Sequence, residues 1–286
     1  MSYFDLIDGM LRTGACALSA GFVTIQRTWL EERQQADGGF VGRSGSSDIY
    51  YTDFALRALS LIAPDSEAFT AAAPFLTARR SPPADVIGAF SELSCEETLS
   101  RRGVTARIDR GPLSEIVARQ ALASGGFGAS GTGELSAYAT FIGMLCRQML
   151  GEPDLSKQAA QAVRRLRCED GGFSELESQS QAQTNATAAA VAVLVMAGDL
   201  QRSEAEEVAG FLRRAQAPDG GLRAHPSAPE GDLLSTYTGL LTLWTLGATD
   251  VIDLAAIGRF LRLVTRAAGG FAATPSDYGA DVEYTY

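Results

Sequence analysis

The sequence has 286 residues, of which 24 are basic and 34 acidic, and it contains a single histidine. A hydrophobic fraction of 46% with 20% charged residues indicates a folded chain with enough apolar residues for a core, not a disordered one. The net charge of −10, with no basic cluster, argues against nucleic acid as a partner.

The N-terminal segment and the hydropathy pattern bear on location. Met1 to Leu18 carries Asp5 and Asp8 before any arginine, which is the wrong charge pattern for a signal peptide. No window approaches the ~18 unbroken apolar residues of a membrane span. The sequence therefore predicts a cytoplasmic protein with no integral membrane segment.

Nearly uncharged apolar segments alternate along the chain with amphipathic segments that carry charge on one face, and both kinds have helical periodicity. In chain order, the apolar segments are Phe4 to Leu18, Tyr50 to Ile62, Asp85 to Leu93, Leu135 to Leu150, Thr184 to Ala197 and Leu233 to Leu246. The amphipathic segments are Phe22 to Arg33, Ser66 to Arg80, Ser114 to Ala123, Leu155 to Arg167, Ala205 to Arg214 and Ala255 to Arg266. Strand-like alternation is absent at any useful length, so we expect an all-α protein.

Glycine is the unusual feature of the composition, with 30 residues. Five Gly-Gly pairs begin at residues 38, 125, 171, 220 and 269, and an apolar residue follows each pair. Successive pairs are 46 or 49 residues apart, except for a first interval of 87. Since that interval is close to twice the others, one unit between Gly39 and Gly125 has lost its glycines. Arginines precede several pairs, a pattern typical of helix C-termini that end in glycine.

The repeat predicts the architecture. One polar-faced and one apolar helix per unit indicates an outer ring around an inner ring, as in stacked repeat proteins. We expect residues 1–286 to form a single all-α domain, an (α/α)6 toroid or barrel of six inner and six outer helices built from units of roughly 48 residues. An open superhelical array is the alternative. Threonines recur in or near the first turns of the inner helices, at Thr52, Thr140, Thr187 and Thr238.

The repeat motifs are similar to those of a known family. Residues 34–40, Gln-Gln-Ala-Asp-Gly-Gly-Phe, and residues 216–222, Gln-Ala-Pro-Asp-Gly-Gly-Leu, resemble the protein prenyltransferase β-subunit and squalene cyclase repeat family. So does the loop-to-helix segment from Gly39 to Arg43 and from Asp48 to Thr52. The resemblance implies an α/α toroid. Known members transfer farnesyl or geranylgeranyl groups to cysteine, or cyclise polyprenes, in an apolar cavity lined by inner helices.

The resemblance also implies a zinc site whose ligands this sequence does not keep. Family transferases hold zinc with Asp-x-Cys at the start of one inner helix and a histidine in a later one. Here the matching segments have Asp232 followed by Leu234 at the cysteine position, and Tyr284 at the histidine position. Leucine cannot ligate a metal and tyrosine is not a donor that zinc prefers, so we expect neither a metal nor another cofactor.

Two further family features point to polar candidates. At the diphosphate site, Gln181 stands where the family has histidine, and Arg223 or His225 falls near the expected arginine. Asp232, Arg223 and His225 are therefore the candidates at the cavity mouth. A lone loop histidine is, however, more often incidental than catalytic.

The Asp-x-Asp-Asp motif with which cyclases protonate an alkene is absent. Asp277, Asp281 and Glu283 form a loose acidic cluster, and a carboxyl with a raised pKa in an apolar lumen can donate a proton, which makes Asp281 a further catalytic candidate. The competing interpretation is that these residues cap a final helical turn, as Asp48 would cap an earlier one.

Aromatic residues recur at helical spacing in the apolar segments and would suit isoprene chains and their carbocations. The candidates for the cavity lining are Tyr51, Phe54, Tyr138, Phe141, Tyr237, Trp244 and Tyr284. The competing interpretation is ordinary core packing.

The four cysteines have no paired spacing, which favours reduced thiols over a zinc ribbon or a disulfide framework. They are Cys16, Cys95, Cys146 and Cys168.

The sequence thus predicts an isoprenoid-binding protein, prenyltransferase-like or terpene-cyclase-like, that acts on a prenyl diphosphate or a polyprene without the family zinc. The alternative is a non-catalytic scaffold that binds a helical-repeat subunit or a second copy of itself. Tyr284 to Tyr286 resembles the first turn of an inner helix that then stops, either because the chain ends there or because it is truncated.

Overall fold

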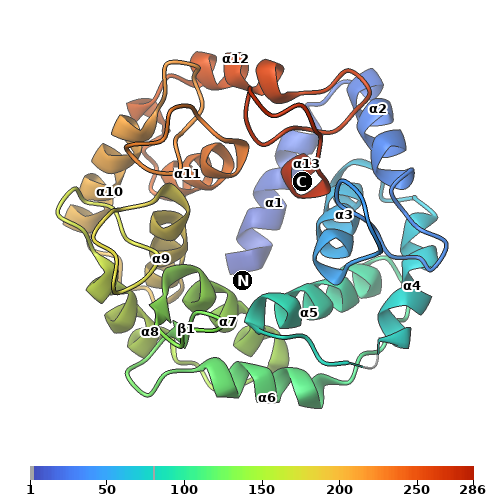
Figure 1. Ribbon diagram of the computed structural model, residues 1–286, viewed down its shortest axis with the longest axis horizontal. Helices are drawn as coiled ribbons and strands as arrows, with labels where there is room; N and C mark the ends of the chain where they lie inside the picture. The colour runs from blue at the N-terminus through green and yellow to red at the C-terminus, as the bar shows by residue number, and fades with distance from the viewer. Residues whose placement is uncertain (1–2, 80) are drawn as a thin grey trace. The chain divides into compact units, whose positions relative to one another are not determined.

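The computed structural model describes residues 3–79 and 81–286, without the side chains of residues 3–6 and 8. All twelve predicted helical segments form helices in the described residues (Figure 1). The apolar helices are α1 (Tyr3–Ala15), α3 (Ile49–Ile62), α5 (Val86–Arg101), α7 (Ala137–Leu150), α9 (Thr184–Met196) and α11 (Leu233–Thr245). The polar-faced helices are α2 (Ala20–Glu31), α4 (Ala68–Ala78), α6 (Arg110–Gln120), α8 (Ser156–Val163), α10 (Arg202–Ala215) and α12 (Leu254–Val264).

Some boundaries differ from those predicted. Helix α5 continues past Leu93 to Arg101, because its buried face continues through Cys95 and Leu99. Helix α6 begins at Arg110 and not at Ser114. The segment after Leu155 divides into α8 and a 3₁₀ turn, η1 (Arg164–Leu166), and a second such turn, η2 (Thr249–Val251), precedes α12. The predicted end of α4 at Arg80 lies outside the described residues. The last element is the single turn α13 (Val282–Thr285).

Four of the five Gly-Gly turns are tied to the apolar helix that follows them, and the fifth is tied to α13 by the hydrogen bond from the Phe271 N–H to Thr285 at 3.1 Å. In those four, the backbone N–H after the glycine pair donates to a buried threonine hydroxyl in the first turn of the apolar helix. The pairs are Phe40 with Thr52, Phe127 with Thr140, Phe173 with Thr187 and Leu222 with Thr236, at 2.8–3.0 Å. In α11 the threonine in this position is Thr236, two residues before Thr238. Thr238 instead donates to Asn185 Oδ1 at 2.7 Å and so joins α11 to α9.

Glycine is required in these turns for two reasons at once. Gly38 and Gly220 have φ values of 91° and 101°, which side-chain-bearing residues rarely adopt. A Cβ at Gly38 would lie 1.9 Å from the carbonyl oxygen of Ala71, and one at Gly220 would lie 2.2 Å from that of Ala256. The turn backbone therefore packs directly on the backbone of the next polar-faced helix, α4 or α12. The predicted unit without glycines is the α4–α5 pair, which a short segment connects.

The helices group into two compact units, and the division falls within α6. Unit 1 contains the described parts of residues 1–116, 265–272 and 278–286. In it α3 packs against the apolar helices α5 and α1 and against α13. The polar-faced helices α2 and α4 also pack against α3. Its core is fully buried around Leu30, Phe40, Leu56 and Leu99. The prediction that residues 1–286 form a single domain stays a prediction.

Unit 2 contains residues 117–264 and 273–277. Helices α7, α9 and α11 lie side by side, with α8 against α7 and α9, α10 against α9 and α11, and α12 against α11 (Figure 1). The first N–H of each apolar helix donates to a loop carbonyl of the next repeat, in the pairs Ala137 with Glu175, Thr184 with Ala224 and Leu233 with Ala273 at 2.7–3.0 Å. A two-stranded antiparallel hairpin, β1 (Phe127–Gly128) and β2 (Leu135–Ser136), is the strand content of the described residues.

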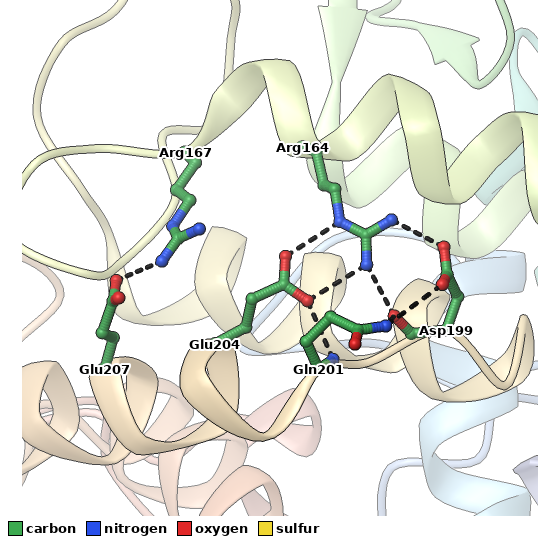
Figure 2. Close-up of polar contacts among 6 residues, drawn as sticks. All are labelled: Arg164, Arg167, Asp199, Gln201, Glu204 and Glu207. Atoms are coloured by element: carbon green, nitrogen blue, oxygen red, sulfur yellow. Dashed lines mark hydrogen bonds and ion pairs between the residues drawn. The ribbon is translucent and has the colours of Figure 1, made fainter.

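A charged network joins η1, which follows α8, to the start of α10 in unit 2 (Figure 2). Arg164 in η1 donates to Glu204 Oε1 at 2.8 Å and to Asp199 Oδ2 at 2.6 Å. Glu204 also accepts from the backbone N–H of Gln201 at 2.9 Å, which completes a capping box at the start of α10. One arginine thereby fixes the position of η1 against the first turn of α10.

No described helix is long and apolar enough to cross a membrane.

The four cysteines are free thiols, with Cys95 and Cys146 buried and Cys16 exposed. Burial raises the pKa of both buried thiols, so they are poor nucleophiles.

Candidate functional site at the start of helix α11

Unit 2 brings three predicted polar residues to the start of α11. Asp232 is the N-cap residue, and its Oδ1 accepts from the backbone N–H of Ser235 at 2.7 Å. Burial raises the pKa of Asp232, while hydrogen bonds from Ser235 and the nearby charge of His225 act in the opposite direction. The loop that carries Arg223 and His225 is paired to Asp232, because Leu222 accepts from the Asp232 N–H at 3.0 Å.

Backbone hydrogen bonds hold the loop that carries Arg223 and His225, so the side chains of these two residues are not required to hold it. Arg223 donates its backbone N–H to Ala215 at 3.0 Å, and its carbonyl accepts from the Thr184 hydroxyl at 2.6 Å. Arg223 Nε and His225 Nδ1 are buried and make no hydrogen bond within the described residues. A buried polar atom without a partner costs about 1–3 kcal/mol, and such atoms often mark functional sites.

The residue at the family's histidine position lies beside the same loop. Gln181 is exposed and donates to Ser227 Oγ at 3.3 Å. The structure therefore gathers Gln181, Arg223, His225 and Asp232 in one region of unit 2, and their functional role stays a prediction.

The donors at this site do not fit zinc. Asp232 is engaged as a helix cap, and Leu234 has no donor atom. Among the described residues, no three His, Cys, Asp or Glu side chains gather as a metal site would require. The expectation of a zinc-free protein stays a prediction.

Asp281 lies in unit 1 and acts as a cap. Its Oδ1 accepts from the Glu283 N–H at 3.1 Å at the start of α13, and its Oδ2 lies 3.2 Å from Arg43 Nε. Tyr50 donates to Glu283 Oε1 at 2.7 Å, and burial raises the pKa of Glu283. The capping interpretation is confirmed for Asp281, and its catalytic role stays a prediction. Of the predicted acidic cluster, Asp281 and Glu283 belong to unit 1, whereas Asp277 belongs to unit 2.

The aromatic candidates of unit 2 lie on part-exposed stripes. Tyr138 is 36% and Trp244 42% exposed, although both lie on apolar helices. On α11 the part-exposed positions Leu234, Tyr237 and Leu241 lead to Trp244, with the i, i+3, i+7 spacing of one helix face. Tyr138 and Phe141 are the corresponding positions of α7, and the α9 positions between them are the small residues Asn185 and Ala188. We call these side chains of α7, α9 and α11 the aromatic wall.

The aromatic candidates of unit 1 pack against neighbouring rings. Phe54 lies 4.9 Å from the ring of Tyr50 and 5.8 Å from that of Tyr286, measured between centroids. Tyr51 is half-buried and lies 5.5 Å from the ring of Tyr50. Tyr284 is half-buried on α13. For Tyr51 and Phe54 the structure thus shows the ring packing that the competing interpretation predicts.

Sequence reasoning missed one ionisable pair. Asp53 is 2% exposed on α3 and lies 3.6 Å from Arg57 Nη1, and burial raises the pKa of Asp53 to about 6. The sequence signal for this pair was an acidic residue and a basic residue four positions apart in an otherwise apolar segment.

Comparisons with known proteins agree with this architecture. The family model described as "Prenyltransferase alpha-alpha toroid domain" matches residues 23–78, 85–198 and 142–286. No curated protein sequence matches the chain significantly.

Solved structures share the fold at low sequence identity. Candida albicans protein geranylgeranyltransferase-I, complexed with GGPP, is 13% identical, with 92% of this chain and 88% of that chain covered and a TM-score of 0.73. The type II terpene cyclase MstE from Scytonema is 16% identical, with 90% and 84% covered and a TM-score of 0.63. A variant of that cyclase, in complex with geranylgeranyl dihydroxybenzoate, is 14% identical, with 93% and 82% covered and a TM-score of 0.62. The predicted fold class, an all-α toroid, is confirmed.

Proposed function

The chain belongs to the prenyltransferase alpha-alpha toroid family, and from this premise we propose that it binds an isoprenoid and acts on a prenyl diphosphate or a polyprene. The aromatic wall of unit 2 would hold the hydrocarbon chain, and the region around Asp232 would hold its polar end. The observation that carries the proposal is the exposure of Tyr138 and Trp244 on helices whose sequences are otherwise apolar. Exposed aromatic rings on such helices are typical of ligand-binding surfaces.

The similar structures support the choice of ligand. The geranylgeranyltransferase is complexed with GGPP, and the terpene cyclase variant with geranylgeranyl dihydroxybenzoate. Both ligands pair a long apolar chain with a polar end. In the protein, the aromatic wall would contact the apolar chain of such a ligand, and the Arg223–His225–Asp232 loop would contact its polar end.

The polar residues suit two reactions. For transfer from an allylic diphosphate, Arg223 and His225 would bind the leaving diphosphate, whose charge grows as the carbon–oxygen bond breaks. For cyclisation, a partly buried carboxyl with a raised pKa, such as Asp232, would protonate an alkene, and the aromatic rings would stabilise the carbocation that forms. We propose that either reaction proceeds without zinc, since Leu234 and Tyr284 stand at the family's cysteine and histidine positions.

Trp244 provides a direct binding test. The chain has two tryptophans, and Trp29 is 5% exposed whereas Trp244 is 42% exposed. Titration with geranylgeranyl diphosphate should change the tryptophan emission of the wild type but not that of Trp244→Phe, because the remaining Trp29 lies in the core of unit 1. No saturable change in the wild type would remove the proposal.

A matched pair of tyrosine variants locates the binding surface. Tyr138→Ser should weaken geranylgeranyl diphosphate binding by roughly tenfold, since stacking on a part-buried ring is lost. Tyr278→Ser removes a tyrosine that is 96% exposed, outside the aromatic wall, and should leave the affinity unchanged. Equal effects of the two substitutions would place the ligand elsewhere.

Product analysis separates the two reactions. Incubation with farnesyl and geranylgeranyl diphosphates releases diphosphate if transfer or ionisation occurs, whereas protonation-driven cyclisation leaves the diphosphate on the product. Metal analysis of protein made without a histidine tag should find less than stoichiometric zinc. Stoichiometric zinc would show that the alignment of Leu234 and Tyr284 to the zinc positions is wrong.

One observation favours the non-catalytic alternative. Leu254 and Leu263 on the polar-faced helix α12 are each 51% exposed, and Leu261 is 37% exposed. Exposed leucines on one helix suit a second subunit or a second copy of the chain. If this surface serves self-association, sedimentation velocity should show a dimer for the wild type and a monomer for the double substitution Leu254→Gln, Leu261→Gln.

We place the protein in the cytoplasm, where free thiols such as the exposed Cys16 are maintained.

A further inference from the structure

Helix α9 carries a polar side chain on its part-exposed face. The helix is otherwise apolar apart from Thr184 and Thr187, which are fully buried. Asn185 is half-buried, and it stands with Ala188 as one of the small residues of the aromatic wall. Its side chain makes no hydrogen bond to the backbone of α9 in the described part of the chain, so capping of the helix does not account for it.

A hydroxyl of the neighbouring helix orients this amide. Thr238 Oγ1 on α11 donates to Asn185 Oδ1 at 2.7 Å, which is a shorter contact than the 2.9 Å from the same hydroxyl to the Leu234 carbonyl. Since the amide oxygen faces Thr238, the Nδ2 group and its two N–H donors point away from Thr238. Asn185 makes no other side-chain hydrogen bond to the described residues. Two donors of an oriented amide are therefore available to a ligand.

A link between helices explains only the oxygen atom of this amide. Thr242 and Thr245 of α11 bond to carbonyls of their own helix at 2.8 and 2.9 Å, and Thr238 has such a carbonyl within 2.9 Å as well. Helix α11 therefore satisfies its hydroxyls without α9. What the contact from Thr238 adds is a fixed direction for the amide of Asn185.

The amide lies where the two proposed ligand surfaces meet. Thr184, the preceding residue, donates its N–H to the Ala224 carbonyl at 2.8 Å and its hydroxyl to the Arg223 carbonyl at 2.6 Å. These bonds fix the first turn of α9 against the loop that carries Arg223 and His225. Helix α9 also packs against both α7 and α11, which carry the rings of the aromatic wall. Asn185 therefore stands at the polar end of the aromatic wall.

We propose that Asn185 determines specificity by donating a hydrogen bond from Nδ2 to a ligand oxygen bonded to the first carbon of the isoprenoid chain. The ligand class is then an oxygen-terminated isoprenoid, such as a prenyl diphosphate or a prenyl ether, and not a hydrocarbon polyprene. This inference rests on the proposed function, because it requires the chain of the ligand on the aromatic wall. A hydrocarbon at the amide would displace water from the N–H groups without replacing its hydrogen bonds, which disfavours binding.

Two probes of nearly the same shape test this preference. One is farnesyl methyl ether, whose oxygen accepts a hydrogen bond and donates none, and the other is its hydrocarbon analogue with CH2 in place of the oxygen. Tryptophan emission follows both titrations, since Trp244 lies on the aromatic wall. The wild type should bind the ether roughly tenfold more tightly, as expected for one hydrogen bond from a half-buried donor. Asn185→Leu should bind both probes equally, and the hydrocarbon at least as tightly as the wild type does.

Substitutions on α11 separate the orientation of the amide from its presence. Thr238→Val removes the hydroxyl that fixes Asn185 and should lower the preference for the ether about threefold, since the amide must then be ordered on binding. Thr245→Val is the matched control and should keep the full preference, because the Thr245 hydroxyl bonds to the Leu241 carbonyl of its own helix. Thermal unfolding verifies that each variant folds. In Asn185→Leu the Thr238 hydroxyl keeps the Leu234 carbonyl as an acceptor.

The outcomes distinguish this inference from the proposed function. Binding of both probes by the wild type with equal affinity, or a preference that persists in Asn185→Leu, would overturn the role of Asn185 and leave isoprenoid binding intact. Binding of neither probe would overturn the proposed function and this inference together. A preference that is lost in Asn185→Leu and kept in Thr245→Val supports both.

Discussion

Phe173 donates its backbone N–H to the hydroxyl oxygen of Thr187 at 2.9 Å, and both residues are buried. The same contact recurs in the other repeats, so a loop-to-helix hydrogen bond is a unit of this fold. Thr187→Val keeps the side-chain volume but leaves the Phe173 N–H without a partner in the core.

We expect Thr187→Val to lower the free energy of unfolding by about 1–3 kcal/mol, the penalty for a buried unsatisfied donor. Urea denaturation measures it, with an unchanged denaturant slope as the sign of an intact native state. The control is Thr24→Val at an exposed position of α2, where the hydroxyl bonds to a carbonyl of its own helix; this substitution should change stability by less than about 0.5 kcal/mol. Equal effects would mean that the loop contact contributes nothing specific.

Substitution of Gly220 tests whether the Gly-Gly turn packs directly on the backbone of α12. Gly220→Ala combines an unfavourable φ with a Cβ that would lie 2.2 Å from the Ala256 carbonyl oxygen. Gly247→Ala is matched, because Gly247 has a φ of 66° and nothing within 4 Å of its Cβ position. Strain alone should cost about 1–2 kcal/mol at Gly247, and the clash should make Gly220→Ala clearly worse by thermal or urea unfolding. Similar losses at both sites would refute the close-packing account.

Glu204 predicts an acid-dependent loss of stability. The hydrogen bond from Arg164 lowers the pKa of Glu204 below its value of about 4.3 in the unfolded chain (Figure 2). A lowered carboxylate pKa contributes stability that is complete above the unfolded pKa and is lost as the pH falls through the folded pKa.

Urea unfolding from pH 7 to pH 3 checks this sign. Glu204→Gln should be less stable than wild type at pH 7, by about 1–3 kcal/mol, and the difference should shrink below about pH 4. Glu206→Gln, which removes the exposed partner of Arg202, should differ from the wild type by less than about 1 kcal/mol throughout. A difference for Glu204→Gln that grows toward acid pH would contradict the assignment.

Asp53 should titrate near neutrality in the folded protein. Burial raises the pKa of Asp53 to about 6, above the ~3.9 of an unfolded aspartate. Stability should therefore fall as the pH rises from about 4 to 6, since only the unfolded chain has lost the proton there. Carboxyl-carbon NMR measures the midpoint directly, with Asp53→Asn to assign the signal. A midpoint below 4 would show that the ion pair with Arg57 outweighs burial.

The helices followed from the sequence because each carries its own signal. Apolar and amphipathic periodicity located all twelve, and the Gly-Gly spacing placed the turns between them. Local patterns were weaker where two signals compete: Thr236 and Thr238 both lie near the start of α11, and only the hydrogen bond from the Leu222 N–H selects Thr236. The α5 end was missed since buried polar residues such as Thr98 do not look apolar.

For the candidate site, the sequence predicted which residues take part but not which contacts their side chains make. Motif spacing placed Arg223, His225 and Asp232 near one helix start and offered Asp281 as a cap, but only the tertiary structure brings Arg43, far away in the chain, to the second oxygen of Asp281.

The sequence by itself determined the repeat, the helices and the family, because helical periodicity and glycine turns are local properties that recur at a fixed interval. Tertiary structure alone decided which side chains are exposed and which charges meet. Tyr138 and Trp244 face solvent while Phe54 packs against Tyr286, although all four are aromatic residues on helical segments or beside them. Exposure and charge convergence depend on neighbours distant in the chain, and no local pattern encodes them.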